Sequence, residues 1–230
     1  MVRLSADNLS IVIASISEAI HFCKYKMLDI NYAESLFNFL YSDIKGYDVS
    51  KNARINFAGD TSNLLYGELP FQTCKELFLQ VNPKSDGVFF DLGSGTGRVV
   101  MQALLATNFK KMVGIELLDG LHDKAVEVKK IFDDNIKDKI FDHVKDREFQ
   151  LIKADLFKQD YSQADFIFMN HPIKDCDLFL KLEEKLFNEL RPGAKVATII
   201  RAFKNPGFKS LGSKAYEFSW GQSTAHFFER

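Results

Sequence analysis

A glycine-rich turn at residues 91–97, with the sequence D-L-G-S-G-T-G, is the segment whose composition points most directly to ligand binding. It follows an apolar run, 88–92, that predicts a buried strand, and it precedes helical spacing over 98–107. Glycine lacks a Cβ atom, so the backbone can turn tightly and approach a ligand. The first N–H groups of the next helix are unpaired and can bind polar ligand atoms. The predicted contacts are Gly93, Ser94, Gly95 and Gly97.

Acidic side chains accompany the ends of three successive predicted strands. Asp91 lies at the end of the first strand, Glu116 at the end of strand 111–117, and Asp155 directly after strand 149–154. Acids at such positions are often solvated loop residues, but three in register with a strand-helix alternation favour a shared site. An acid that ends the second strand is placed to bind ribose hydroxyls. We therefore predict that these acids line one binding site.

Strands and helices alternate through most of the chain, which predicts a parallel, doubly wound α/β sheet. Two apolar segments near the C-terminus, 215–220 and 224–228, flank Gly221-Gln222 and predict a β-hairpin. The predicted helices are 71–81, 98–107, 122–139 and 178–190, and the predicted strands are 88–92, 111–117, 149–154, 166–169 and 195–200.

Residues 1–60 are predicted to be a helical extension, separate from a ligand-binding domain at 61–230. Ser5 and Asp7 are plausible caps for a first helix that reaches Cys23, and a second helix is predicted over 32–44. The polar stretch 48–52 after Gly46 predicts a linker.

Bulk composition argues against several classes of protein. The net charge of −1 argues against a nucleic-acid substrate, because no global positive field gathers phosphates. Three widely spaced cysteines argue against a disulfide framework and a zinc site. No apolar run approaches the ~18 residues of a membrane span, and no signal peptide is evident. We expect a soluble, cytoplasmic protein, and the sequence leaves its oligomeric state undetermined.

The glycine turn distinguishes between two cofactor classes. Dinucleotide-binding enzymes need G-x-G-x-x-G, and Arg98 stands where the last glycine would be. The G-x-G-x-G form led by an acid resembles motif I of class I S-adenosylmethionine-dependent methyltransferases. The resemblance implies a Rossmann-like seven-stranded sheet with a C-terminal hairpin, and S-adenosyl-L-methionine as cofactor. It implies that Asp91 acts near the cofactor's amino-acid end and Asp155 near the adenine amino group. An NAD-type or degenerate binding fold is the alternative.

A second motif narrows the resemblance. Residues 66–71 read Y-G-E-L-P-F, and the turn continues as G-R-V-V-M-Q over 97–102. Together they resemble the non-SET, disruptor-of-telomeric-silencing family of histone-lysine methyltransferases, over about residues 64–201. The resemblance implies that the loop of Tyr66 and Glu68 covers the methionine end of the cofactor. It also implies that Gln102 reaches the cofactor and that Asn170 lies beside the reacting methyl group.

The loop after strand 166–169 departs from that family. The family has N-N-F followed by an aromatic residue, whereas this chain has N-H-P-I-K over 170–174. The leading hypothesis is N-methylation of a protein lysine, which requires no metal, with Asn170, His171 and Tyr66 as catalytic candidates. His171 could act as a base or simply pack the rim of the site. Methylation of a small-molecule or nucleobase amine, and a catalytically silent cofactor-binding fold, are the alternatives.

Overall fold

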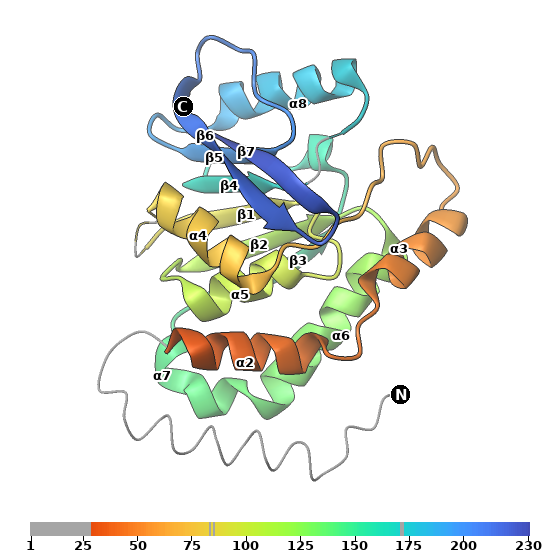
Figure 1. The fold of residues 1–230 in the computed structure, drawn as a ribbon, viewed down its shortest axis with the longest axis vertical. Helices are drawn as coiled ribbons and strands as arrows, with labels where there is room; N and C mark the ends of the chain where they lie inside the picture. Colours follow the sequence, from red (N-terminus) through yellow and green to blue (C-terminus); the bar gives the residue numbers. More distant parts are fainter. Residues whose placement is uncertain (1–28, 83, 85, 171–172) are drawn as a thin grey trace.

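The computed structural model describes residues 29–230 apart from 83, 85, 171 and 172, and its centre is a seven-stranded sheet (Figure 1). The strand order is β3-β2-β1-β4-β5-β7-β6. Strands β1 to β5 are mutually parallel, whereas β7 is antiparallel to β5 and β6. This arrangement confirms the predicted Rossmann-like sheet with a C-terminal hairpin. The bounds are β1 Val88–Leu92, β2 Lys111–Glu116, β3 Glu148–Lys153, β4 Phe166–Met169, β5 Lys195–Ile199, β6 Lys209–Phe218 and β7 Gly221–Glu229.

Phenylalanine side chains pack the central strands against helix α4 (Phe71–Val81). The rings of Phe89 in β1 and Phe166 in β4 are buried, with centroids 5.5 Å apart. The ring of Phe78 in α4 meets the Phe89 ring edge-on at 5.5 Å. Strands buried on both faces carry continuous apolar runs rather than an alternation. This packing fixes β1, whose carboxyl end leads into the glycine turn.

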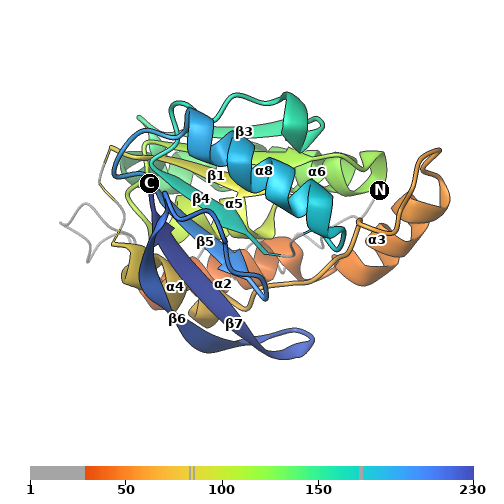
Figure 2. The same cartoon turned by 90° about the horizontal axis from the view of Figure 1, so that it is seen from above.

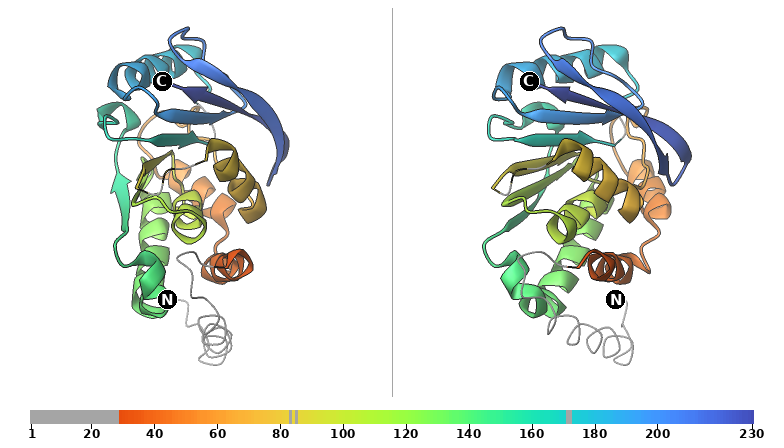
Figure 3. Two further views of the ribbon diagram at one scale, coloured as in Figure 1. Left: turned by 90° about the vertical axis from the view of Figure 1, so that its left-hand side faces the viewer. Right: turned by 60° about the vertical axis from the view of Figure 1, so that its left-hand side comes forward.

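Helices cover both faces of the sheet, as Figures 2 and 3 show. The side chains of α2, α4, α5 and α6 share one buried cluster with the sheet, and α8 packs on the opposite face. No helix in the described part of the chain is long and apolar enough to cross a bilayer. The bounds are α2 Ile30–Tyr41, α5 Arg98–Ala106, α6 Asp119–Asn135, α7 Phe141–Val144, α8 Cys176–Glu189, and the 3₁₀ turns η1 Lys137–Ile140 and η2 Leu156–Lys158.

The described part of the predicted N-terminal extension packs directly on the sheet domain. Helix α2 lies against α5, and Leu36 and Phe37 belong to the same buried cluster as β1. Its N-cap is Asp29, which accepts hydrogen bonds from two N–H groups of the first turn. The predicted first helix lies in residues 1–28, outside the described residues. The predicted domain boundary at residue 60 stays a prediction.

The predicted linker at residues 48–52 is wrong, because helix α3 (Gly46–Ile55) occupies this segment. Helix α3 lies against α6, with Ser50 and Ala53 buried. A Cβ atom added at Gly120 of α6 would lie 3.2 Å from the Cβ of Ala53, so the two backbones approach closely. Since only a narrow face of small residues is buried, the apolar period that would predict a helix is absent.

The C-terminal hairpin differs in extent from the prediction. Strand β6 begins at Lys209 rather than near 215, and its first seven residues are exposed, so they show no apolar alternation. Ser219 and Trp220 form the turn instead of ending the strand. This places both side chains where they contact the Y-G-E loop, residues 66–68.

Candidate active site

A cavity of about 390 Å³ lies at the carboxyl ends of β1, β2 and β4 and beside η2. Its lining includes nine of the predicted site residues: Tyr66, Glu68, Asp91, Gly93, Ser94, Gly95, Glu116, Asp155 and Asn170. Gly97 and Gln102 are not part of the lining, and His171 lies outside the described residues. The strand ends therefore bring together residues that are up to 104 positions apart in the sequence, from Tyr66 to Asn170.

The glycine turn is held against β2. The N–H groups of Gly93 and Ser94 both donate to the carbonyl oxygen of Ile115, at 2.9 Å. Gly95 and Gly97 have φ values of +56° and +78°, a region that L side chains rarely adopt. A Cβ atom at Gly95 would lie 2.8 Å from the Tyr66 ring. Any larger residue at this position would therefore prevent the Y-G-E loop from packing on the turn.

Gly97 acts in packing rather than at the cavity wall. It precedes α5 as its N-cap. A Cβ atom there would lie 3.1 Å from the Cβ of Ala125 in α6. The third glycine thus lets the turn pack closely against a neighbouring helix.

Glu116 ties the cavity floor together. Its Oε2 accepts a hydrogen bond from the Gly95 N–H at 2.8 Å, and its Oε1 accepts bonds from the N–H groups of Leu117 and Leu118 at 2.9 and 2.8 Å. Burial raises the pKa of this carboxyl, while the three backbone bonds lower it. The side chain therefore holds the glycine turn in shape and faces the cavity at the end of β2.

Asp91 is a buried acid whose Oδ1 has no hydrogen-bond partner among the described residues. Burial, and then the charge of Glu116, raise the pKa of Asp91 to about 8. A carboxylate removed from water is costly unless an opposite charge or donors compensate it. An acid in this position therefore suits a ligand with a cationic or N–H group.

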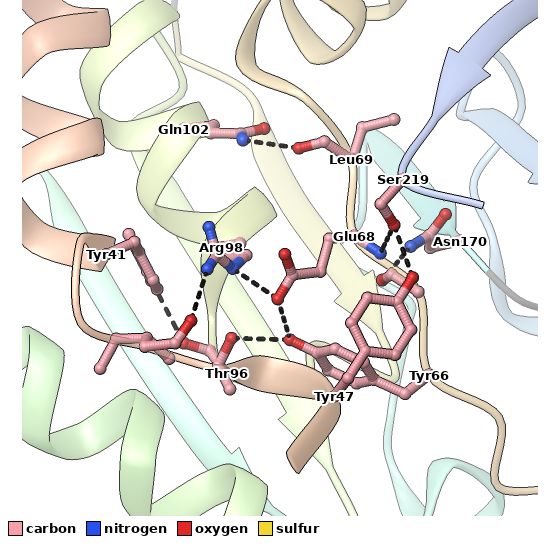
Figure 4. A network of polar contacts seen from close by, with 12 residues as sticks. Tyr41, Tyr47, Tyr66, Glu68, Leu69, Thr96, Arg98, Gln102, Asn170 and Ser219 are labelled. Atoms are coloured by element: carbon pink, nitrogen blue, oxygen red, sulfur yellow. Dashed lines mark hydrogen bonds and ion pairs between the residues drawn. The ribbon is translucent and has the colours of Figure 1, made fainter. Parts of the chain in front are cut away.

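The Y-G-E loop closes the cavity through a polar network (Figure 4). The Tyr66 hydroxyl donates to Oε1 of Glu68 at 2.9 Å and lies 3.1 Å from Oγ1 of Thr96. The same Glu68 oxygen lies 3.0 Å from Nε of Arg98. Burial and the Glu68 charge raise the pKa of Tyr66 further above its ordinary value. Tyr66 therefore keeps its proton and acts as a donor that orders the loop.

The hairpin turn and α3 clamp this loop from outside. Oγ of Ser219 accepts a hydrogen bond from the Glu68 N–H at 3.0 Å and lies 2.7 Å from the Tyr47 hydroxyl. A Cβ atom at Gly67 would lie 2.2 Å from the Trp220 ring, so the ring rests on the loop backbone. Sequence reasoning missed Tyr47, Ser219 and Trp220, because no local pattern links them to the loop.

Asn170 follows β4 and is fixed by the same loop. Its Nδ2 donates to the carbonyl oxygen of Gly67 at 2.8 Å. Its Oδ1 is buried and has no partner among the described residues. The amide therefore presents an acceptor to the cavity that can orient a ligand N–H group.

Gln102 has a different place from the one predicted. Its Nε2 donates to the carbonyl oxygen of Leu69 at 3.0 Å, and its side chain is 1% exposed, behind the cavity wall. It anchors the segment after the Y-G-E loop to α5. Asp155, by contrast, lines the cavity and caps η2 by accepting a hydrogen bond from the Phe157 N–H at 3.0 Å.

Two solved structures show what class of fold this is. The RNA methyltransferase of Salinibacter ruber, solved with S-adenosyl-L-homocysteine, is 21% identical with a TM-score of 0.51, covering 70% of this chain and 92% of that one. The magnesium protoporphyrin IX methyltransferase of Synechocystis PCC 6803 is 10% identical with a TM-score of 0.51, covering 86% and 97%. At these identities the likeness concerns the fold, which is that of class I methyltransferases.

The family model of histone methylation protein DOT1 matches residues 48–218, and the chain belongs to this family. The H3 lysine-79 specific histone-lysine N-methyltransferase of Kluyveromyces lactis is 27% identical over 161 residues, which are 64% of this chain and 26% of that relative. The chain thus spans about a quarter of this curated relative. The match begins inside α3, a helix that the sequence assigned to a linker.

Proposed function

We propose that this chain is an S-adenosyl-L-methionine-dependent methyltransferase that methylates a lysine side chain of a protein. One observation carries the proposal, namely the order of polar side chains along the cavity. Asp155, Glu116, Asp91 and Asn170 lie at the carboxyl ends of β3, β2, β1 and β4, which are successive strands of the sheet. An elongated ligand across this edge would meet them in that order, as its adenine, ribose, methionine part and methyl group. The family membership and the activity named for the relative support lysine as acceptor.

Two buried oxygen atoms support the fit of this cofactor and of an amine acceptor beside it. Oδ1 of Asp91 and Oδ1 of Asn170 lack partners among the described residues, and both residues line the cavity. Asp91 would hold the ammonium group of the methionine part, and Glu116 the ribose hydroxyls. Gly93 lines the cavity, and no atom lies within 4 Å of the point where its Cβ would be. A ligand could therefore use this open space to approach the backbone of the turn closely.

The chain's own residues would mainly align the reactants. When bound, the cofactor would supply a methyl group on a positively charged sulfur: the amine nitrogen would form a bond to the methyl carbon as the C–S bond breaks, and the sulfur would leave as a neutral thioether. The bond from Nδ2 of Asn170 to Gly67 fixes the amide, so Oδ1 would accept an N–H of the amine and aim its lone pair. A lysine ammonium, with an ordinary pKa of about 10.4, must lose a proton first, and burial favours that loss. A role for His171 in this proton transfer stays a prediction.

Calorimetric titration with S-adenosyl-L-methionine, with NAD as control, tests the cofactor class. We expect micromolar binding of the first ligand and none of NAD. Incubation with methyl-labelled cofactor and cell lysate then tests the acceptor. Label in protein bands that yields methyl-lysine on hydrolysis supports the proposal, and purified histones should be tested beside the lysate. Label in small molecules or nucleic acid, or cofactor binding without transfer, would instead favour one of the two alternatives.

The cytoplasmic location stays a prediction from the sequence. Immunofluorescence of the full chain in its host cell tests it. A nuclear or exported pool would contradict this prediction without affecting the proposed chemistry.

A further inference from the structure

The ionisable side chains around the cavity are mostly acidic. Five acids belong to its lining: Asp60, Glu68, Asp91, Glu116 and Asp155. Among the described lining residues, Arg98 is the one cation. S-adenosyl-L-methionine carries two positive groups, the sulfonium and the ammonium, and one negative group, the carboxylate. The acids suit the positive groups, which leaves Arg98 as the charged group suited to the carboxylate.

Arg98 is also fixed in place. It is the first residue of α5, directly after the glycine turn. Its Nε lies 3.0 Å from Oε1 of Glu68, and its Nη2 donates to the carbonyl oxygen of Ile44 at 3.1 Å. The guanidinium lies over the Tyr41 ring, 4.6 Å from the centroid, and the side chain is 16% exposed. These contacts hold a mostly desolvated cation in one orientation.

The guanidinium keeps donors for a further acceptor. It has five N–H groups, whereas the Glu68 and Ile44 contacts involve Nε and Nη2. The ion pair and the hydrogen bond leave Nη1 uninvolved, and the buried Nε has no hydrogen-bond partner among the described residues. A carboxylate could therefore join Glu68 at Arg98 without displacing it, and such charge-assisted bonds are stronger than neutral ones.

The position along the cavity agrees with this assignment. Arg98 follows β1, so it lies at the strand end that carries Asp91 rather than at the β3 end that carries Asp155. It also contacts Glu68 of the Y-G-E loop, which closes this part of the cavity. The family motif leaves the residue before V-V open, so the resemblance gives Arg98 no role.

The geometry points to Arg98 as the residue that binds the carboxylate of the cofactor's methionine part, an inference that rests on the proposed function. Arg98 would thereby select amino-acid-bearing cofactors over adenosine derivatives without that group. Its contact with Glu68 would couple the bound carboxylate to closure of the Y-G-E loop.

Three ligands test the inference by calorimetry: S-adenosyl-L-methionine, its decarboxylated form, and 5′-methylthioadenosine. Wild-type protein should bind the first about 30-fold more tightly than the second, as expected for a lost charge-assisted pair. In Arg98→Met this ratio should fall to about 1–3, with 5′-methylthioadenosine affinity nearly unchanged. Arg98→Lys should keep part of the preference, since it keeps the charge.

The outcomes distinguish a failure of the role of Arg98 from a failure of the proposed function. Equal wild-type affinity for S-adenosyl-L-methionine and its decarboxylated form overturns the role of Arg98, even if Arg98→Met fails to fold. A ratio unchanged in Arg98→Met and in Arg98→Lys overturns it as well. If folded wild-type protein binds none of the three ligands, the proposed cofactor is wrong, and the inference falls with it.

Discussion

The cofactor half of the cavity, beside the glycine turn and Glu116, and its acceptor half, beside Asn170, are built from different kinds of contact. At the ends of β1 and β2, N–H groups of the glycine turn donate to the carbonyl oxygen of Ile115 in β2 and to Glu116, and Glu116 also accepts from the two N–H groups directly after β2. Beside Asn170, the contacts of Asn170 and Ser219 join segments that are far apart in the sequence. Asn170 bonds to Gly67, and the Tyr47 hydroxyl lies 2.7 Å from Ser219 Oγ, across 103 and 172 sequence positions.

The two ends of the cavity therefore differ in how freely their sequences can change. The cofactor half depends on a short motif whose parts need one another, so its residues keep a recognisable pattern. The acceptor half depends on how the loop after β4, the hairpin turn and α3 pack together. Its residues can change while the cofactor half stays intact, which fits the departure from N-N-F at residues 170–174.

Asn170→Ala should show the largest effect if the two halves are separable. The variant removes the buried acceptor Oδ1, and loss of one oriented polar group at a reacting centre typically costs ~10²–10³-fold in kcat. The affinity for S-adenosyl-L-methionine should stay within about threefold, since the hydrogen bond of Asn170 goes to Gly67 and not to the glycine turn. Single-turnover label transfer and calorimetry measure the two quantities, with exposed Asn52→Ala as control. A large loss of cofactor affinity in Asn170→Ala would show that the two halves of the cavity are not independent.

Asp91→Asn should weaken cofactor binding, which Asn170→Ala should leave nearly unchanged. It removes the charge that would pair with the cofactor's ammonium group, and breaking a buried charge pair should raise Kd about 50-fold. Calorimetry measures Kd, and Asp165→Asn, at the opposite ends of the strands where it accepts from the Val88 N–H, is the control. An unchanged Kd in Asp91→Asn would remove Asp91 from the binding site.

Cofactor binding should depend on pH through the raised pKa of Asp91. Because the pKa is raised from 3.8 to about 8, the carboxyl holds a proton near neutral pH and must release it to pair with a cation. Affinity should rise by up to about tenfold per pH unit from pH ~6 to ~7.5, with about one proton released at pH 7. Calorimetry in buffers of different ionisation enthalpy counts the proton, and Asp91→Asn should abolish both effects. Proton release that persists in Asp91→Asn would point to another group.

The same pKa shift affects stability without cofactor. The folded state keeps a proton on Asp91 that the unfolded state loses above pH ~4, so the free energy of unfolding should fall as pH rises to about 8. Urea denaturation of wild-type protein and Asp91→Asn across this window measures the difference.

Arg201→Met should have the smallest effect and should be confined to the acceptor half. Nη1 of Arg201 donates to the carbonyl oxygens of Ile173 and Asp175, at 3.1 and 3.4 Å, in the loop that follows Asn170. Loosening this loop should lower kcat about threefold to tenfold, with little change in cofactor Kd. Arg191→Met is a matched control, because Arg191 bonds to Gln163 and Asp165 away from the cavity. A larger effect on Kd than on kcat would contradict this assignment.

The elements with a strong local period were predictable. Helix α4 and strand β1 have the predicted bounds, because continuous apolar runs and helical spacing depend on neighbouring residues alone. Helix α3 was not predictable, because its buried face consists of small and polar residues that pack only where α6 offers Gly120. The direction of the Gln102 side chain was not predictable either, since a position in a motif does not say which way a side chain points from its helix.

The sequence alone determined the sheet class, the glycine turn and the three acids, since parallel strands place their carboxyl ends at one edge. The three-dimensional packing was needed to show that Asn170 bonds to Gly67, that Trp220 rests on the Y-G-E loop, and that Arg98 lines the cavity. These outcomes depend on packing between segments far apart in the chain. The physical reason is that hydrophobic periodicity specifies which face of an element is buried, but not which distant side chain it meets.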